Sequence, residues 1–353
     1  MGEKKVELAQ RVAACKAKGQ IFWVNLKASD AYSPPLLERL DGLCRKYGTT
    51  VEVRFFGDCF DAANLRYLPS VQNLTLDCLN EIRNEDEMAA LPHLRRLSFQ
   101  VRELNRPEFL STLNLSHLEV LRLMGTPRPN LDLKPLAKAH RLHKLTVESH
   151  RRGIESLVEL PKLEHLTLWG QPRSQSLAFV SALPALRGLS LGFGGRETLD
   201  DLQSQTLESL SVARVNGLRD LGPIRRYPRL TGLSVADQIR LSSINLTGTS
   251  MQYLSVANCR NLTEIAGLEQ CSGLVRFNAL FPLGLPWDEL RDRRWPASLR
   301  VLSLWSPNMK WNKSARALHD ARGYQESVKE SPQSAPDTDF VGDGIYTAAD
   351  LAS

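Results

Sequence analysis

A short apolar pattern recurs along most of the chain and constrains its fold more than any other feature. Each copy has an apolar residue, two variable residues, a second apolar residue, one small residue and a third apolar residue, as in Leu163-Glu-His-Leu166-Thr-Leu168. The second apolar position recurs every 21–25 residues, at Leu74, Leu97, Leu121, Leu145, Leu166, Leu189, Leu210, Leu233, Leu254, Phe277 and Leu302. Repeats of this length are typical of a solenoid, in which each unit buries its apolar face only against its neighbours.

Two weaker copies, centred on Val24 and Val53, bring the number of candidate strands to thirteen. Because side chains alternate along a strand, the last two apolar residues of a copy point into the core and the residue between them points outward. The pattern therefore predicts an α/β repeat solenoid. We expect a curved parallel sheet on its concave face and short turns or irregular helices on its convex face.

These repeats resemble those of the leucine-rich repeat superfamily over residues 50–305. The 21–25-residue units look most like the short bacterial and phosphatase-regulator types, and the resemblance implies a horseshoe fold while saying almost nothing about function. The asparagine that usually follows the last strand leucine by three residues is missing, and its slot holds His150, Gln171, Gly194, Val215, Gln238 and Cys259. We therefore expect no regular asparagine ladder, irregular turns and variable curvature.

The segments outside the repeats are expected to cover the ends of the solenoid, because terminal repeats otherwise expose apolar core. Residues 1–49 predict a helix–strand–helix cap, with helices at 4–18 and 35–47. Residues 306–323 predict a C-terminal cap. The last coil is expected to be plugged by four tryptophans, Trp287, Trp295, Trp305 and Trp311. Residues 324–353 predict an acidic disordered tail, because they are low in apolar content.

Charge, cysteine content and the lack of long apolar runs indicate the cellular compartment of this chain. The net charge is +6, but residues 324–353 carry −5, which leaves +11 for the body of the chain. The six cysteines include no C-x-x-C pair, which indicates free thiols in a reducing compartment. No apolar run is long enough to span a membrane, and the first residues lack the apolar core of a secretion signal. We therefore expect a cytoplasmic protein with no membrane partner.

No motif in the sequence has the spacing of a catalytic or metal site. The histidines in HRLHKLTVESH do not converge in the predicted register, as metal ligands would have to. The GFGG segment at 192–195 lacks the Lys-Ser/Thr of a phosphate loop, so it is expected to be a tight turn. The DCFD segment at 58–61 has the Cys-x-Asp of some bacterial leucine-rich repeat ubiquitin ligases, but the chain has no room for their helical domain. We expect no enzyme activity, metal, cofactor or small-molecule substrate.

The outward-facing positions of the predicted sheet offer a candidate binding surface. The central outward column is mostly Ser and Thr, and the positions beside it are tiny from Gly188 and Gly192 through Ala236 to Ala257. Such a smooth trough would let a partner approach closely, although small residues also suit a crowded parallel sheet without any partner. The bulkier residues selected as partner-contacting at this face are His165, Trp169, Tyr253 and Trp305.

Arginine recurs just past the predicted strands of eight successive repeats. The positions are Arg102, Arg128, Arg151 with Arg152, Arg173, Arg196, Arg214, Arg240 and Arg260. Turns on one side of a solenoid stack, so strands ~4.8 Å apart would make a rim roughly 35 Å long or more. Arginine favours bidentate contact with carboxylates or phosphates, although a row of charges can also be no more than a solvated face.

The sequence therefore favours a non-catalytic protein-binding scaffold that engages an acidic protein through its concave face and arginine rim. A bacterial toxin-neutralising, immunity-type protein would have this architecture. Two alternatives stay open: a nucleic-acid-binding protein that uses the arginine rim, and a regulatory subunit of a signalling enzyme. The opposite charges of tail and body also suggest autoinhibition, in which the tail lies on the rim.

Overall fold

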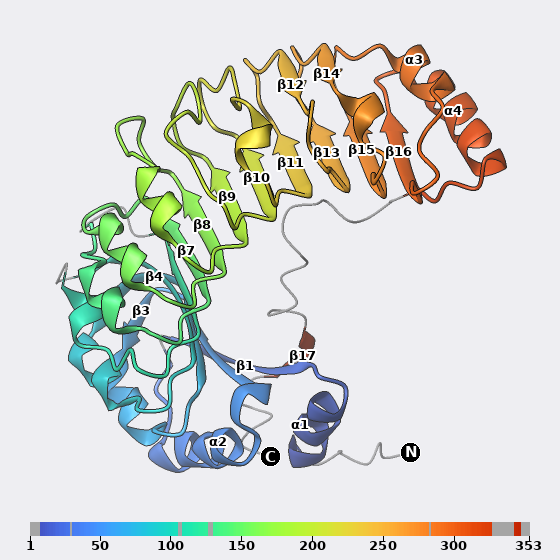
Figure 1. The fold of residues 1–353 in the computed structure, drawn as a ribbon. Coiled ribbons are helices and arrows are strands. Elements are labelled where there is room, and N and C mark those ends of the chain that lie inside the picture. Colours follow the sequence, from blue (N-terminus) through green and yellow to red (C-terminus); the bar gives the residue numbers. More distant parts are fainter. Residues whose placement is uncertain are drawn as a thin grey trace, which may run out of the picture. The chain divides into compact units, whose positions relative to one another are not determined.

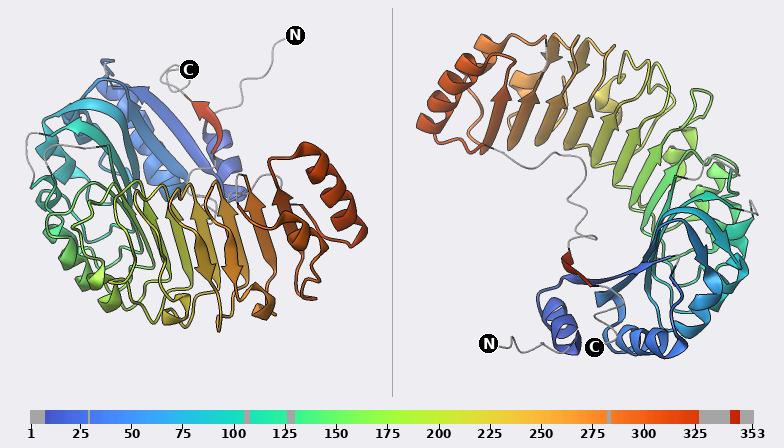
Figure 2. Two further views of the ribbon diagram at one scale, coloured as in Figure 1. Left: turned by 90° about the horizontal axis from the view of Figure 1, so that it is seen from above. Right: turned by 180° about the vertical axis from the view of Figure 1, so that it is seen from behind.

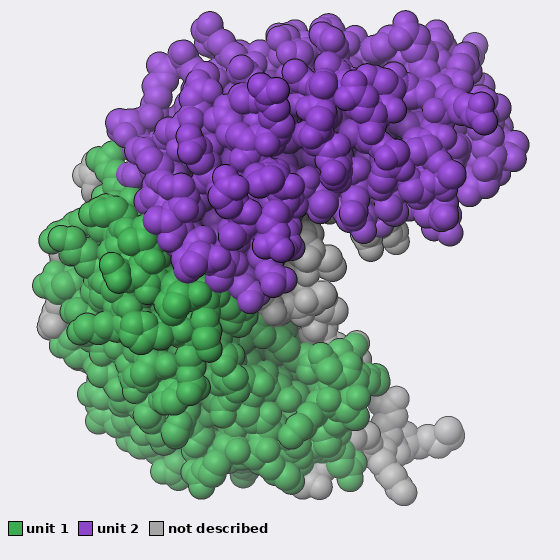
Figure 3. Space-filling model, viewed as in Figure 1, with its two compact units in different colours: residues 1–163, 337–353 green, residues 164–336 purple. Residues whose placement is uncertain are grey.

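The computed structural model of the chain describes residues 8–28, 30–104, 108–125, 130–281 and 284–326, and the backbone of 342–346. It divides into two compact units (Figure 3). The first comprises Met1–Leu163 with Asp337–Ser353, and the second comprises Glu164–Pro336. Each unit is a stack of short parallel strands, joined by turns and short helices (Figure 1).

The structure confirms the predicted α/β repeat solenoid, because every one of the thirteen predicted strand positions lies in a strand. In the first unit these strands are β1 (Ile21–Lys27), β2 (Val51–Phe56), β4 (Asn73–Arg83), β5 (Arg96–Glu103), β6 (Val120–Met124) and β7 (Lys144–Glu148). In the second they are β8 (His165–Trp169), β9 (Gly188–Gly192), β10 (Ser209–Ala213), β11 (Gly232–Ala236), β13 (Tyr253–Ala257), β15 (Arg276–Leu280) and β16 (Val301–Trp305). Within each unit, successive strands of these series pair in parallel.

The segments that return from one strand to the next are short and irregular, as predicted. Most contain one turn of 3-10 helix: η1 (Gly48–Thr50), η2 (Ala62–Tyr67), η3 (Glu85–Ala90), η4 (Phe109–Ser111), η5 (Lys134–Lys138), η6 (Ile154–Glu159), η7 (Ala178–Ala182), η8 (Ile224–Arg226) and η9 (Leu268–Gln270). Two returns also contribute one strand each to a small parallel sheet, β12 (Ser243–Asn245) and β14 (Glu264–Ala266), and η9 follows β14 in the same return. One further short strand, β3 (Cys59–Asp61), pairs with β4.

The core follows the repeat pattern. In the second unit Leu166, Leu189, Leu210, Leu233 and Leu254 pair in one register row, and each is at most 2% exposed. Burial of one such side chain stabilises the fold by ~1.5–3 kcal/mol. The apolar periodicity therefore determines both the spacing of the strands and the face that each strand buries.

The asparagine ladder is absent, as predicted, but its slot is not left empty. Gln238 is fully buried and its Nε2 donates to the carbonyl of Ala236 at 3.0 Å. The Cys259 thiol donates to the carbonyl of Ala257 at 3.2 Å, and His150 Nδ1 accepts from the N–H of Leu131 at 3.1 Å. Several residue types thus replace asparagine in hydrogen-bonding the turn backbones.

Helices lie at both ends of the chain's repeats. The helices predicted at 4–18 and 35–47 are α1 (Leu8–Ala17) and α2 (Pro34–Tyr47), and residues 4–7 lie outside the described part of the chain. Tyr47 joins the two helices, because its hydroxyl donates to the carbonyl of Ala9 at 2.9 Å. Near the other end, α3 (Trp287–Asp292) lies between β15 and β16, and α4 (Met309–Ala321) follows β16. Among the described residues, no helix combines the length and apolar character needed to cross a membrane.

The four tryptophans near the C-terminal end take different positions. Trp295 is 6% exposed and packs against Phe277, with ring centroids 5.2 Å apart. Trp287 of α3 packs against Trp311 of α4 at 5.6 Å. The prediction that all four plug the last coil is wrong for Trp305, because this residue ends β16 in the outward-facing register. Its ring instead lies 6.1 Å from that of the exposed Phe281.

The acidic tail also differs from its prediction. Gly342–Tyr346 form a strand, β17, which pairs in parallel with β1. The low apolar content of the tail predicts disorder, but the backbone groups of the short Gly-Asp-Gly-Ile-Tyr segment pair with the edge of β1. The described part of the tail therefore lies on β1, and residues 327–341 and 347–353, which the autoinhibition hypothesis also concerns, lie outside the described residues.

Candidate functional site

The outward face of the second unit's sheet has three columns of side chains, in the register that the sequence predicted. The central column is Thr167, Ser190, Ser211, Ser234, Ser255, Asn278 and Ser303. One flanking column is His165, Gly188, Ser209, Gly232, Tyr253, Arg276 and Val301, and the other is Trp169, Gly192, Ala213, Ala236, Ala257, Leu280 and Trp305. Three of the selected aromatic residues, Trp169, Tyr253 and Trp305, therefore do lie on one face of one sheet.

The central column becomes inaccessible toward the end of the sheet. Ser234 is 8% exposed, Ser255 4%, Asn278 2% and Ser303 1%. Low exposure of such small side chains is expected in a crowded parallel sheet. The central column is therefore a packing feature over the last four strands, and contact with a partner falls to the flanking columns.

The smooth trough is shorter than the sequence predicted. Gly188 and Gly192 are buried, because the side chains of the preceding strand lie across them. A Cβ atom added to Gly188 would come within 2.5 Å of His165 Nδ1, and one added to Gly192 within 3.0 Å of Trp169 Cδ1. The accessible small residues are therefore Ser209, Ala213, Gly232, Ala236 and Ala257, which we call the small-residue floor.

A second row of residues follows the strands directly and is held in an uncommon backbone conformation. This strand-end row is Gly170, Phe193, Arg214, Asp237 and Asn258, with φ of 65°, 54°, 53°, 54° and 52°. The N–H of each of these residues donates to the carbonyl of the last residue of the next strand, for example Phe193 to Ala213 at 3.1 Å and Asp237 to Ala257 at 2.9 Å. The left-handed region costs roughly 1–2 kcal/mol for a residue with a side chain, so this ladder must enforce it.

The side chains of the strand-end row form a continuous chain of contacts. The Phe193 ring stands edge-on to Trp169, with centroids 5.4 Å apart, and the Arg214 guanidinium lies 5.5 Å from the Phe193 centroid. Arg214 Nε donates to Asp237 at 3.0 Å, and Asn258 Nδ2 donates to the other oxygen of the same carboxylate at 3.0 Å. Phe193 nevertheless remains 54% exposed.

The sequence reasoning missed two aromatic residues of this surface. Phe193 follows β9 directly, and Phe281, which is 42% exposed, follows β15 directly. The signal that marks them is an aromatic residue immediately after the strand in two separate repeats. Together with Trp169 and Trp305 they place a pair of aromatic rings at each end of the small-residue floor.

The arginines selected in the second unit do not form one uniform column. Arg214 follows its strand by one residue, Arg260 by three, and Arg173, Arg196 and Arg240 by four. Three of the five form ion pairs: Arg173 with Glu197, Arg196 with Asp201, and Arg214 with Asp237. Arg240 and Arg260 are exposed, and no ion pair is seen for them within the described part of the chain. The positive charge of this edge is therefore largely balanced at one end and less so at the other.

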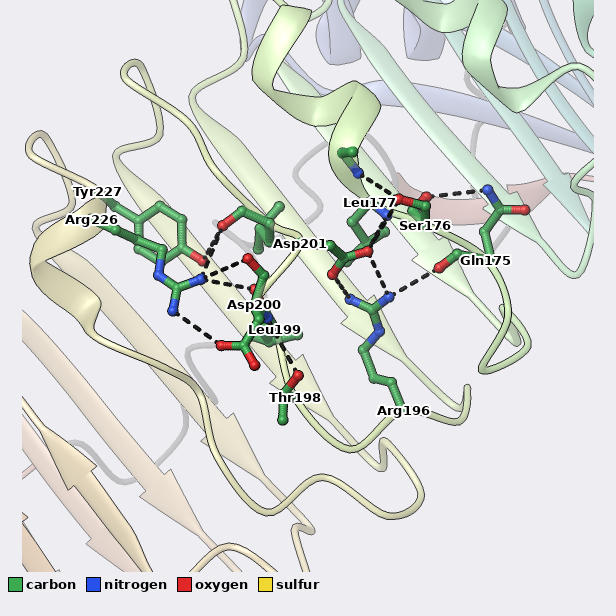
Figure 4. Close-up of polar contacts among 12 residues, drawn as sticks. Gln175, Ser176, Leu177, Arg196, Thr198, Leu199, Asp200, Asp201, Arg226 and Tyr227 are labelled. Carbon is green, nitrogen blue, oxygen red and sulfur yellow. Dashed lines mark hydrogen bonds and ion pairs between the residues drawn. The ribbon is translucent and has the colours of Figure 1, made fainter.

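Arg196 braces a loop. Its side chain is only 12% exposed and donates to Asp201 at 3.0 Å and to the carbonyl of Gln175 at 3.0 Å (Figure 4). Asp201 also accepts the N–H of Leu177 at 2.7 Å. Burial alone would raise the pKa of Asp201, but the hydrogen bonds from Leu177, Arg196 and Ser176 together lower it. A polar hollow of about 380 Å³ lies beside this network, and its charged lining is already engaged in these pairs.

Arg226 holds the neighbouring loop in the same way. Its guanidinium donates to the carbonyls of Leu199 and Asp200 at 3.2 and 3.1 Å, while the Tyr227 hydroxyl donates to the carbonyl of Leu202 at 3.2 Å (Figure 4). The hydrogen bonds satisfy carbonyl groups of a segment without regular structure. These partly buried arginines therefore stabilise the repeat edge.

The remaining selected arginines belong to the first unit. Arg152 lies 3.3 Å from a carboxylate oxygen of Asp132, and the backbone N–H of Arg151 donates to the Asn130 side chain at 3.0 Å. Arg102 is exposed, and Arg128 lies outside the described residues. In the described part of the chain, no group of three or more His, Cys, Asp or Glu side chains is arranged to hold a metal ion.

Comparison with known proteins identifies the architecture and little else. No family model and no curated protein matches this sequence. Among solved structures the chain is similar to an internalin of Listeria monocytogenes, with a TM-score of 0.50 and 18% identity over 92% of this chain and 95% of that one. It is also similar to the Toll–Spätzle complex of Drosophila, with a TM-score of 0.48 and 14% identity over 83% of this chain and 44% of that one. The similarity to the internalin, at 18% identity, shows a shared fold.

Proposed function

We propose that this chain, whose fold is that of the leucine-rich repeat proteins, is a non-catalytic protein-binding scaffold. The partner binds on the outward face of the second unit's sheet, between the two aromatic pairs. The supporting observation is the small-residue floor with exposed aromatic residues at both of its ends. A few residues that become fully desolvated, often aromatic ones, carry most of the energy of a typical protein interface.

The dimensions of this surface suit a helix or a loop. Four strand steps separate β9 from β15, which corresponds to ~19 Å at the spacing of parallel strands. A helix with its side chains is ~10–12 Å across, so one helix fits over the floor with an aromatic pair on either side. Ser209, Gly232 and Ala236 would let its side chains come close to the sheet.

The charges of the strand-end edge favour a partner with an acidic segment. Arg240 and Arg260 are exposed there, so a carboxylate beside them would gain charge-assisted hydrogen bonds. Arg173 and Arg214 already have carboxylate partners, so they contribute less than an unpaired row would. An immunity-type protein that neutralises a toxin in the bacterial cytoplasm and a regulatory subunit of a signalling enzyme would both use such a surface.

The test is affinity capture with the full chain as bait, compared with a variant carrying Phe193→Ser and Phe281→Ser. Both residues are exposed, so circular dichroism and thermal unfolding should be nearly unchanged. We expect the double variant to lose one specific captured protein. The matched control is Met309→Ser, which removes another exposed apolar side chain (67% exposed) at the start of α4. Equal capture by all three baits would show that the outward face is not the binding surface.

A nucleic-acid partner is the second candidate. It is favoured by the exposed Arg240 and Arg260 on a face that also carries the aromatic Phe193 and Tyr253, on which unpaired bases could stack. Such binding would weaken steeply between low and physiological salt. Titration of the full chain with single-stranded RNA and DNA at low salt tests it, and an absence of binding there would exclude this candidate.

A further inference from the structure

The first strand of the sheet in the first unit is covered by the tail of the same chain. One edge of β1 pairs with β2 over six residue pairs, from Phe22 with Val51 to Lys27 with Phe56. The other edge pairs in parallel with β17, matching Ile21 with Gly342, Trp23 with Ile345 and Val24 with Tyr346. Figure 2 shows β17 alongside β1 in both of its views.

Without this cover, β1 would be a strong template for another strand. Its sequence is IFWVNLK, which contains no proline, no acidic residue and a single charge at its last position. Phe22, Val24 and Leu26 are buried in the core, so the strand cannot turn its apolar face away. An apolar edge strand with unpaired N–H and C=O groups pairs readily with strands of other molecules, and proteins commonly protect such edges.

The last strand of the second unit, β16, is also covered at its edge, but by a residue that is anchored to a helix. Gln325 extends the sheet beyond β16: its N–H donates to Arg300 at 2.8 Å and its carbonyl accepts from Leu302 at 2.9 Å. Gln325 is held in place by its neighbours, because Tyr324 bonds back to His319 of α4 and Glu326 pairs with Arg316 at 2.8 Å. The contact that the structure describes for β17 is its backbone pairing with β1.

We propose that Gly342–Tyr346 is an intramolecular guard strand for β1, and that its release opens β1 to pair with β1 of a second copy of the chain. Two identical edges related by a two-fold axis would pair in antiparallel fashion and form a closed dimer. This interface is separate from the partner surface proposed for the second unit. It can therefore hold or fail independently of that function.

The first experiment compares the full chain with a chain ending at Glu326, which retains Gln325 and its contacts. We expect light scattering to show roughly a doubled molar mass for the shortened chain at concentrations where the full chain is monomeric. The amides of β1 are followed by hydrogen exchange in the dilute, monomeric range, where those facing β17 should exchange roughly tenfold faster or more after truncation. The amides of β16 serve as the internal reference for an intact fold.

The second experiment separates loss of pairing from loss of chain length. The full-length variant Ile345→Pro keeps the length of the tail but prevents strand formation, so it should behave like the shortened chain. A peptide with the sequence FVGDGIYTA should dissociate the dimer of the shortened chain, and its Ile345→Pro counterpart should not. Unchanged molar mass and unchanged β1 exchange in both protein variants would overturn the proposal, as would equal action of the two peptides.

Discussion

Single residues decide which side chains the second unit presents. Phe193 and Arg214 have backbone conformations that normally favour glycine, with φ of 54° and 53°. Hydrogen bonds to the next strand hold both residues there, at the edge of the outward face. The geometry is costly, and nothing in the packing of the core requires an aromatic ring on the surface. The unfavourable backbone conformation of Phe193 and Arg214 therefore lowers stability while it exposes their side chains at this edge.

The strain at Phe193 can be measured with two variants that both remove the ring. Asparagine tolerates the left-handed region, whereas a β-branched residue does so poorly. We expect Phe193→Val to unfold at lower urea concentration than Phe193→Asn, by the equivalent of about 1–2 kcal/mol. Equal midpoints for the two variants would mean that the ladder does not enforce this conformation in solution.

His150 should make stability depend on pH. Burial lowers its pKa from 6.5 to about 4, so the folded chain keeps this imidazole neutral while the unfolded chain protonates it near pH 6.5. The contribution of a neutral His150 to the free energy of unfolding is therefore fully present above pH 6.5. It is lost as the pH drops toward 4, by up to roughly 3 kcal/mol. In His150→Gln, an amide oxygen can still accept from Leu131, and this part of the pH dependence should disappear. Urea unfolding of both proteins at pH 7.5, 5.5 and 4.5 tests this, and parallel curves would contradict it.

At the scale of the element, several strand-and-turn units contain a hydrogen-bonding side chain buried behind the strand. Gln171, Gln238 and Cys259 are of two residue types, yet the side chain of each donates to the carbonyl two residues earlier. The common requirement is a donor that reaches the turn backbone, and asparagine is only one way to meet it. This explains how regular strands persist in a chain that lacks the usual asparagine.

Replacing the donor at Gln238 should therefore be costly. In Gln238→Leu the Ala236 carbonyl loses its side-chain partner and keeps the N–H of Arg214, so we expect the second unit to be destabilised by about 0.5–1.5 kcal/mol, the net contribution of one hydrogen bond. The matched control is Gln252→Leu, at an exposed position directly before β13, which should change stability by less than about 0.5 kcal/mol. Similar unfolding midpoints for the two variants would argue against a structural role for this slot.

At the scale of the whole molecule, stability should be distributed along the repeats. Within each unit the thirteen repeat strands pair with their neighbours in the series, and β3 and β17 add to β4 and β1, so the energy of the fold is close to a sum of repeat and interface contributions. The two compact units then need not lose their structure together.

A cavity in the second unit tests this expectation. Leu233 is 2% exposed, and Leu233→Ala should cost about 2–5 kcal/mol. We expect native-state hydrogen exchange to accelerate in β10, β11 and β13, while the amides of β2 and β4 exchange as before. Equal acceleration in both units would show that the chain unfolds as a single cooperative body.

Several features of this chain could be predicted because their causes are local. The alternation of Leu166, Thr167 and Leu168 assigns each side chain to a face, since neighbouring residues of a strand point to opposite sides. Repetition of that triplet gives the register, because equivalent leucines of successive repeats share one core. The same alternation predicts that Trp169, Tyr253 and Trp305 lie on the outward face.

The features that only the tertiary structure decided all depend on contacts between residues that are distant in sequence. Glu197 balances Arg173 and Asp237 balances Arg214 across successive repeats, and the side chain of His165 covers Gly188 of the next strand. β17 pairs with β1 from the opposite end of the chain. Periodicity determines where a strand lies and which way it faces, but whether an outward side chain is free or engaged depends on its neighbours in space.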